Sequence, residues 1–192
     1  MRAMEQSKPW PGKLLPPLIT ITGLKRSGKT AVVEAIVSEL CSLGHEVGTI
    51  KTMRHHRVSL GAEETDTRRH AEAGAAVVVA LHADGTVCFE KGASPATRLD
   101  VSRFFPGSVD ILISEGLLDP AEARNVVLCV RNPLDLEETL RVRRISRDSI
   151  VAISGTGASA WRDPAFPAYD VMVPEQRKAL VEMLLKRVVG NQ

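Results

Sequence analysis

The sequence is poor in aromatic residues and in net charge. Only 4% of its 192 residues are Phe, Trp or Tyr, so it lacks the stacking platform that single-stranded nucleic acids require. Lysine and arginine total 25 against 23 acidic residues, a net charge of +2, whereas nucleic-acid-binding domains usually carry a strong basic excess. Both shortages argue against a nucleic-acid partner.

Cysteines are few and long apolar runs are absent. Cys41, Cys88 and Cys129 lie far apart and form no Cys-x-x-Cys pair, so neither a disulfide framework nor a zinc site is indicated. No stretch reaches the roughly 18 apolar residues of a membrane span, and residues 1–17 lack the apolar run of a secretory signal. We therefore expect a cytoplasmic protein with reduced cysteines, no membrane segment and a flexible, proline-rich leader over residues 1–17.

The sequence does contain short apolar runs that alternate with longer amphipathic ones. Apolar runs typical of strands occupy residues 18–22, 46–51, 109–114, 126–130 and 150–153, and helical patterns occupy residues 30–43, 65–73 and 175–189. An Ala-Asp-Gly turn at residues 83–85 lies between two further runs and indicates a β-hairpin. We predict one domain over residues 18–192, a three-layer α/β/α fold with a mostly parallel sheet and a β-hairpin extension.

Residues 23–30 read Gly-Leu-Lys-Arg-Ser-Gly-Lys-Thr and match the phosphate-loop pattern G-x-x-x-x-G-K-[ST] at every specified position. The glycines let the backbone wrap so that successive N–H groups face one anion at the N-terminus of the following helix. Lys29 can then reach the β- and γ-phosphates, and the Thr30 hydroxyl can bind Mg²⁺. The expected nucleotide-binding residues of this segment are Gly23, Lys25, Arg26, Ser27, Gly28, Lys29, Thr30 and Ala31.

Charged residues end two other predicted strands. Lys51 ends the second strand, at the carboxyl edge of the sheet where ligands of parallel strands bind, so we expect it at the phosphates as well. Glu115 follows a buried strand as a Walker B acid does and would hold Mg²⁺ beside Thr30; the alternative is a structural hydrogen-bond acceptor. Asp66 fits either a partner of the helix dipole or a third metal ligand. Lys29 and Glu115 are the candidate catalytic residues.

The roles of three loops stay open from the sequence. The basic loop after Lys51 contains His55 and His56, and it fits either a switch segment that faces a polyanion or an ordinary solvated loop. Adjacent imidazoles seldom bind one metal ion. Asn-Pro-Leu-Asp at residues 132–135 is similar to the guanine-binding pattern Asn-Lys-x-Asp but also fits a turn. Ser-Gly-Thr-Gly at residues 154–157 fits a base-binding loop or a plain glycine loop.

Four segments in order resemble the MobB family, the molybdopterin-guanine dinucleotide biosynthesis adaptor proteins of the P-loop GTPase superfamily. The four segments are Gly23–Thr30, Val47–Lys51 with the histidines that follow it, Asp66–Ala75 and Asp110–Gly116. The resemblance implies a GTP- and Mg²⁺-binding accessory protein, at most a slow GTP hydrolase. It also implies a homodimer that assists a MobA-like nucleotidyltransferase and other molybdopterin pathway proteins. Family roles fall on Lys29, Thr30, Lys51, Asp66 and Glu115, with His55, His56 and Arg69 as switch or partner contacts.

The chain also departs from the family pattern. Thr52 stands where the family has a histidine, and the acidic residues of the next loop are missing. Two other functions therefore stay open. One is an ATP-dependent ligase or kinase similar to dethiobiotin synthetase, which also combines a phosphate loop with a lysine after the second strand and a strand-end Glu-Gly. The other is a metallochaperone GTPase, which only His55 and His56 support.

Overall fold

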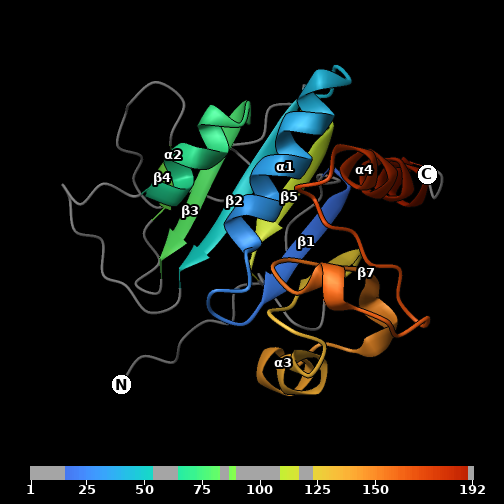
Figure 1. Ribbon diagram of the computed structural model, residues 1–192. Helices are drawn as coiled ribbons and strands as arrows, with labels where there is room; N and C mark the ends of the chain where they lie inside the picture. The colour runs from blue at the N-terminus through green and yellow to red at the C-terminus, as the bar shows by residue number, and fades with distance from the viewer. Residues whose placement is uncertain (1–15, 54–64, 83–86, 90–108, 117–122, 190–192) are drawn as a thin grey trace, which may run out of the picture.

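The computed structural model describes residues 16–53, 65–82, 87–89, 109–116 and 123–189 (Figure 1). Its strands are β1 (Leu18–Gly23), β2 (Val47–Met53), β3 (Val77–His82), β4 (Val87–Phe89), β5 (Ile111–Glu115), β6 (Val126–Cys129) and β7 (Ile150–Ser154). Its helices are α1 (Lys29–Ser42), α2 (Thr65–Glu72), α3 (Asp135–Arg143) and α4 (Pro174–Val189), with short 3₁₀ turns η3 (Arg147–Ser149) and η4 (Ala158–Ala160).

Within these residues the strands form one sheet in the order β4-β3-β2-β5-β1-β6-β7. All neighbours pair in parallel except β3 and β4, which pair antiparallel. Every residue of β5 and β6 is buried, as expected for parallel strands covered on both faces. The carboxyl ends of β1, β2 and β5 therefore meet at one edge of the sheet.

Helices cover both faces of the sheet. On one face, α1 and α4 pack on Ile21 and Val127 in a common core, with Ala73 and Ala75 packed at its border next to α2. On the other face, Leu136 of α3 packs against alternate residues of β6. Because neighbouring residues of a strand point to opposite faces, β6 contributes to both cores, and the three layers follow (Figure 1).

The predicted α/β/α fold, its mostly parallel sheet and the β3–β4 hairpin are confirmed. Helix α1 ends as expected, with Gly44 at φ +90° directly after the cap residue. Helix α3 was not predicted. It has only nine residues, and its buried residues are Asp135, Leu136 and Thr139. With one apolar residue among these three, the sequence shows little of the apolar periodicity that marks a helix. The acids of its first turn and Arg141 and Arg143 in its last turn are the signal that could have found it.

Two sequence expectations fall mostly outside the described residues. The proline-rich leader is described only at residues 16 and 17, and the hairpin turn at residues 83–86 is not described. Among the helices that are described, none combines the length and apolar character needed to cross a bilayer.

Candidate functional site

The loop between β1 and α1 has the backbone shape that the phosphate-loop pattern predicts. Arg26 and Gly28 adopt left-handed angles, with φ of +63° and +85°. The buried Ser27 hydroxyl donates to the Leu24 carbonyl oxygen over 2.9 Å and closes the loop on itself. Gly28 is the N-cap of α1 and supplies no side-chain acceptor, and the first turn holds no acidic residue. The first N–H groups of α1 thus face the loop without a side-chain cap, an arrangement suited to an anion.

Lys29 lies along this loop. Its ammonium donates to the Leu24 carbonyl oxygen over 2.7 Å. Burial lowers the pKa of Lys29, while the nearby negative charge of Glu115 acts in the opposite direction. A phosphate bound in the loop would offer this ammonium a stronger, charged acceptor than the carbonyl.

Glu115, at the end of β5, binds three side chains from three other elements. The Thr30 hydroxyl donates to its carboxylate over 3.1 and 3.2 Å, and the Lys51 ammonium lies 3.3 Å from both oxygens. His70 Nε2 of α2 lies 3.0 Å from Oε2. The Glu115 side chain is only 7% exposed, so these contacts form in a largely dry environment.

His70 and Lys51 keep Glu115 ionised. Burial alone raises the pKa of Glu115, but the hydrogen bond with His70 and the charge of Lys51 outweigh it and bring the pKa to about 2. A carboxylate that stays charged at neutral pH accepts hydrogen bonds and binds cations, but it does not deliver a proton. Glu115 is therefore suited to hold a cation.

The parallel sheet explains why Lys51 and Glu115 meet. They are register partners in the β2–β5 pair, although 64 residues separate them. Directly after Glu115, Gly116 has φ +93°, and a Cβ atom there would overlap the Thr52 hydroxyl. Glycine is required at this position so that the chain can turn away immediately.

The oxygen donors at this edge fit Mg²⁺. A hydroxyl from Thr30 and a carboxylate from Glu115 lie within hydrogen-bond distance of each other, and Mg²⁺ in nucleotide sites binds to such hard donors together with phosphates and water. Asp66 lies in the first turn of α2, but its side chain lies outside the described residues. The described ranges hold no group of three or more His, Cys, Asp and Glu that could bind a metal ion.

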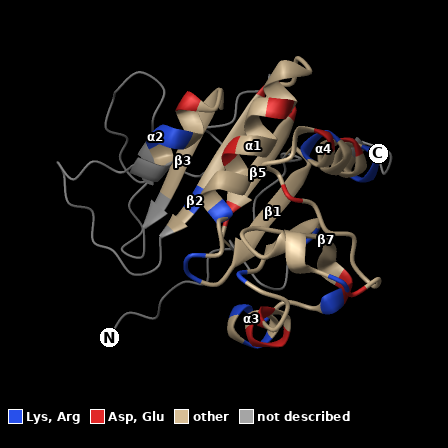
Figure 2. Ribbon diagram, in the orientation of Figure 1, with Lys and Arg blue, Asp and Glu red and all other residues tan. Residues whose placement is uncertain are grey.

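The remaining predicted residues lie at the rim. Lys25 and Arg26 are exposed at the tip of the loop before α1, which is basic in Figure 2, and Ala31 is half-buried in the first turn of α1. Arg69 points to α1, where its guanidinium donates to Glu34 over 3.0 Å. His55 and His56 lie outside the described residues, so the switch-loop prediction has no structural test here.

Two residues of the site were not predicted from the sequence. His70 falls within the segment that resembles the family, but helical spacing does not say which side chain of α2 points to Glu115. Arg143, on the unpredicted α3, donates to the Gly23 carbonyl oxygen over 3.1 Å from Nε and 2.6 Å from Nη2. It thereby connects the far face of the sheet to the start of the loop.

The Asn-Pro-Leu-Asp segment forms the turn that starts α3. Asn132 Oδ1 accepts from the Leu134 N–H over 2.9 Å, and Asp135 accepts from Arg131 through the backbone N–H, Nε and Nη2, each over 2.8 Å. The Arg131 side chain holds the pKa of Asp135 at about 2. Both Asp135 oxygens are engaged, which favours the turn interpretation over guanine binding.

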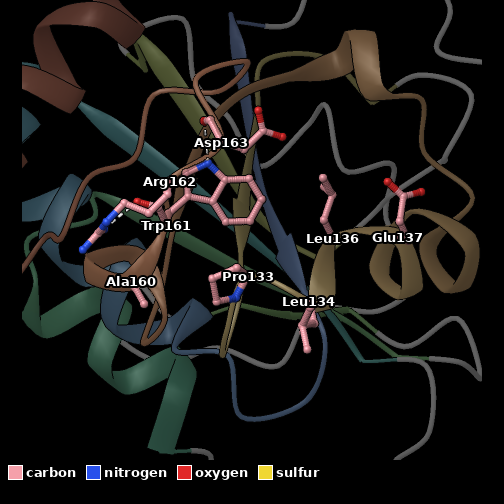
Figure 3. A pocket seen from close by; sticks show the side chains of 8 residues that line it. All are labelled: Pro133, Leu134, Leu136, Glu137, Ala160, Trp161, Arg162 and Asp163. Atoms are coloured by element: carbon pink, nitrogen blue, oxygen red, sulfur yellow. Dashed lines mark hydrogen bonds between the residues drawn. The ribbon is translucent and has the colours of Figure 1, made fainter.

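The Ser-Gly-Thr-Gly loop after β7 packs on the phosphate-loop segment. The Thr156 N–H donates to the Ser27 carbonyl oxygen over 3.2 Å, and a Cβ atom at Gly155 would overlap that same oxygen. Between the α3 turn and η4 lies a hollow of about 480 Å³. Trp161, Pro133 and Leu134 line it, and Figure 3 shows Pro133, from the turn before α3, next to the Trp161 ring. The β7 loop thus borders the phosphate-loop segment.

Three kinds of comparison with known proteins each give a match. A family model described as molybdopterin guanine dinucleotide synthesis protein B, MobB, matches residues 18–156. A Haemophilus influenzae protein named molybdopterin-guanine dinucleotide biosynthesis adapter protein is 29% identical over 101 residues. That alignment covers 52% of this chain and 56% of the relative, so this chain matches only about half of the relative's length. The crystal structure of Bacillus subtilis MobB, at 19% identity, covers 87% of this chain and 97% of its own with a TM-score of 0.52, and shows the same fold.

Proposed function

The chain belongs to the MobB family, whose model matches most of its length, and from this premise we propose that it is a GTP-binding accessory protein of molybdenum cofactor biosynthesis. The observation that carries the proposal is the convergence of Thr30 and Lys51 on Glu115 beside the Gly23–Thr30 loop. Three segments distant in sequence meet at one edge of the sheet. They supply a phosphate-binding loop, the Lys51 ammonium and the Glu115 carboxylate, and P-loop nucleotide sites are built from groups of these kinds.

In the proposed mechanism, backbone N–H groups of the loop and the N-terminus of α1 bind the phosphates. Lys29 exchanges the Leu24 carbonyl oxygen for a phosphate oxygen, and Lys51 adds a second positive charge. Thr30 and Glu115 would hold Mg²⁺, which when bound neutralises charge on the phosphates. This chain's own residues therefore bind and orient the nucleotide.

Slow hydrolysis follows from what surrounds Glu115. Its carboxylate is ionised and already accepts from three side chains, so it is poorly placed to activate water. Gln6, Gln176 and Gln192 are the glutamines of the chain, and Gln176 accepts from the Asp170 N–H at the start of α4. Among the described residues, then, no glutamine is in position to orient water as in fast GTPases. We therefore propose a weak GTPase that serves a partner.

Titration calorimetry with GTP and ATP, each in the presence of Mg²⁺, tests the nucleotide site. GTP should bind more tightly than ATP, and Lys29→Ala should weaken binding at least about tenfold, or about 1.4 kcal/mol. Tighter ATP binding together with stoichiometric turnover of a small acid would instead support the ligase alternative. Equal GTP affinity of the wild type and Lys29→Ala would contradict the proposal that the Gly23–Thr30 loop binds the phosphates.

The partners are proposed from the family. The relative from Haemophilus influenzae is named an adapter protein, which supports an accessory role next to a MobA-like nucleotidyltransferase in the cytoplasm. A homodimer is proposed on the same basis. Light scattering of the purified chain should give twice the mass of one chain, and an affinity-tagged chain should retain the nucleotidyltransferase of the same genome. A monomer that retains no nucleotidyltransferase would contradict both proposals.

A further inference from the structure

The third partner of Glu115 comes from α2, an element outside the phosphate-loop motif. His70 is fully buried, with 0% of its surface exposed, and its Nε2 lies 3.0 Å from Glu115 Oε2. Its other ring nitrogen, Nδ1, is buried and has no hydrogen-bond partner among the described residues. The ring therefore makes its one polar contact in the described structure with the carboxylate.

The chemistry of this contact determines its direction. An ionised carboxylate only accepts hydrogen bonds, so Nε2 must carry the hydrogen and donate it to Glu115. Hydrogen bonds to charged acceptors are stronger than those between neutral groups, and this one forms away from solvent. His70 thus restrains one oxygen of Glu115, while the other can still face Thr30 and Lys51.

Helix α2 is itself held in place on α1. The Cys41 thiol donates to the Gly74 carbonyl oxygen over 3.2 Å, and the Ala75 N–H donates to the His70 carbonyl oxygen over 3.2 Å. Arg69, next to His70, pairs with Glu34 of α1. These contacts fix the His70 backbone independently of Glu115, so the imidazole is a rigid support.

We propose that His70 is a positioning residue that orients the Glu115 carboxylate for a divalent cation bound with the nucleotide. The proposal rests on the proposed nucleotide-binding function and adds a role that the phosphate-loop pattern does not contain. Among the described residues, the polar contact of the His70 ring is with Glu115 and not with the Gly23–Thr30 loop. His70 therefore contributes to the gain in nucleotide affinity that Mg²⁺ provides, and not to nucleotide binding without Mg²⁺.

A pair of amide variants separates this role from simple filling of the core. The side-chain nitrogen of glutamine reaches the place of Nε2, so His70→Gln keeps a donor for Glu115. Asparagine is shorter, so His70→Asn leaves Glu115 without that donor. His45→Asn is a matched control, because His45 pairs with Asp110 near the opposite end of the strands.

The experiment is calorimetric titration of GTP into the full-length chain, once with Mg²⁺ and once with EDTA. The ratio of the two Kd values is the Mg²⁺ gain. We expect His70→Asn to reduce this gain about tenfold and to leave the Kd in EDTA within about twofold. His70→Gln and His45→Asn should keep the wild-type gain.

Each outcome has one meaning. If wild-type protein does not bind GTP, the proposed function fails, whatever the variants do. If wild type shows a Mg²⁺ gain and folded His70→Asn keeps it, the positioning role is overturned. Equal loss of affinity in Mg²⁺ and in EDTA, with lower thermal stability, would also overturn it in favour of a packing role. Should His70→Asn not fold, His70→Gln decides: retained gain supports the role, and lost gain in a folded protein overturns it.

Discussion

At the scale of the residue, Glu115 concentrates the physical chemistry of the site. A buried carboxylate is costly unless it is paired and hydrogen-bonded, and here Lys51, Thr30 and His70 provide both. The same contacts that make burial tolerable keep the group charged at neutral pH, with its pKa at about 2. The contacts that stabilise the buried carboxylate therefore also keep it suited to the cation that we propose it binds.

Glu115→Gln tests this arrangement through acid stability. The folded-state pKa of Glu115, about 2, is below the ordinary value of 4.5, so its ionisation stabilises the fold at neutral pH. This contribution is lost as the pH falls from about 4.5 towards 2, because the unfolded chain then binds the proton more readily. We expect Glu115→Gln to lower the free energy of unfolding at pH 7 by about 2 kcal/mol and to flatten its dependence on acid pH, measured by urea unfolding.

Asp135→Asn is the matched control for that measurement. The pKa of Asp135 is also about 2, below the ordinary 3.8, because of the Arg131 side chain. Asp135→Asn should therefore also flatten the dependence of the free energy of unfolding on acid pH. It lies away from Thr30 and should keep the Mg²⁺ gain in GTP affinity, whereas Glu115→Gln should lose it. Equal Mg²⁺ gain in both variants would contradict the role of Glu115 as a cation ligand.

At the scale of the element, the loop after β7 and helix α3 both support the loop after β1. The β7 loop packs on the phosphate-loop segment at Ser27, and Arg143 of α3 bonds to Gly23. A phosphate-binding loop must have its N–H groups aligned before the anion arrives, because ordering a flexible loop on binding reduces affinity. These neighbours supply that alignment.

Gly155→Ala tests the support from the β7 loop. Gly155 has φ +89°, and a Cβ atom would overlap the Ser27 carbonyl oxygen, so the substitution should displace the phosphate-loop segment and weaken GTP binding about tenfold. Gly44→Ala is the control, since Gly44 has φ +90° but no atom within 4 Å of the added Cβ. Both variants should lose about 1 kcal/mol of stability from the backbone angle, but Gly44→Ala should bind GTP normally. Normal GTP binding by Gly155→Ala would show that the β7 loop does not support the site.

At the scale of the whole molecule, the site joins the sheet to helices on both faces. β1, β2 and β5 meet at Glu115, α1 and α2 reach it from one face, and α3 touches the loop through Arg143 from the other. A ligand bound here, as we propose, would lie where these elements meet. Its binding free energy should therefore stabilise the whole domain.

Thermal unfolding with and without GTP and Mg²⁺ tests this expectation. At a ligand concentration about 100 times Kd, binding adds about 2.7 kcal/mol to the folded state, which corresponds to a Tm increase of about 5–10 °C for a domain of this size. The increase should occur in one cooperative transition, and Lys29→Ala should lose most of it. Two separate transitions, of which only one shifts, would show that the site stabilises just part of the chain.

The sequence alone determined the seven strands and helices α1, α2 and α4 along the chain, the phosphate-loop segment and the strand-end positions of Lys51 and Glu115. These features depend on local patterns: apolar periodicity, glycine spacing, and the rule that parallel strands present their carboxyl ends at one edge. The family resemblance, based on such segments, agrees with the matching family model. Helix α3 was missed because its local pattern is short and polar.

Only the tertiary structure decided which side chains meet across these elements. His70 lies 45 residues from Glu115 in sequence, and Arg143 lies 120 residues from Gly23; no local pattern specifies either contact. The contacts depend on how α2 and α3 pack on opposite faces of the sheet. The engagement of both Asp135 oxygens by Arg131 likewise depends on the rotamers in the packed turn. Sequence placed the charges at the edge of the sheet, and packing selected their partners, because burial makes each polar group take the partner that the fold brings within reach.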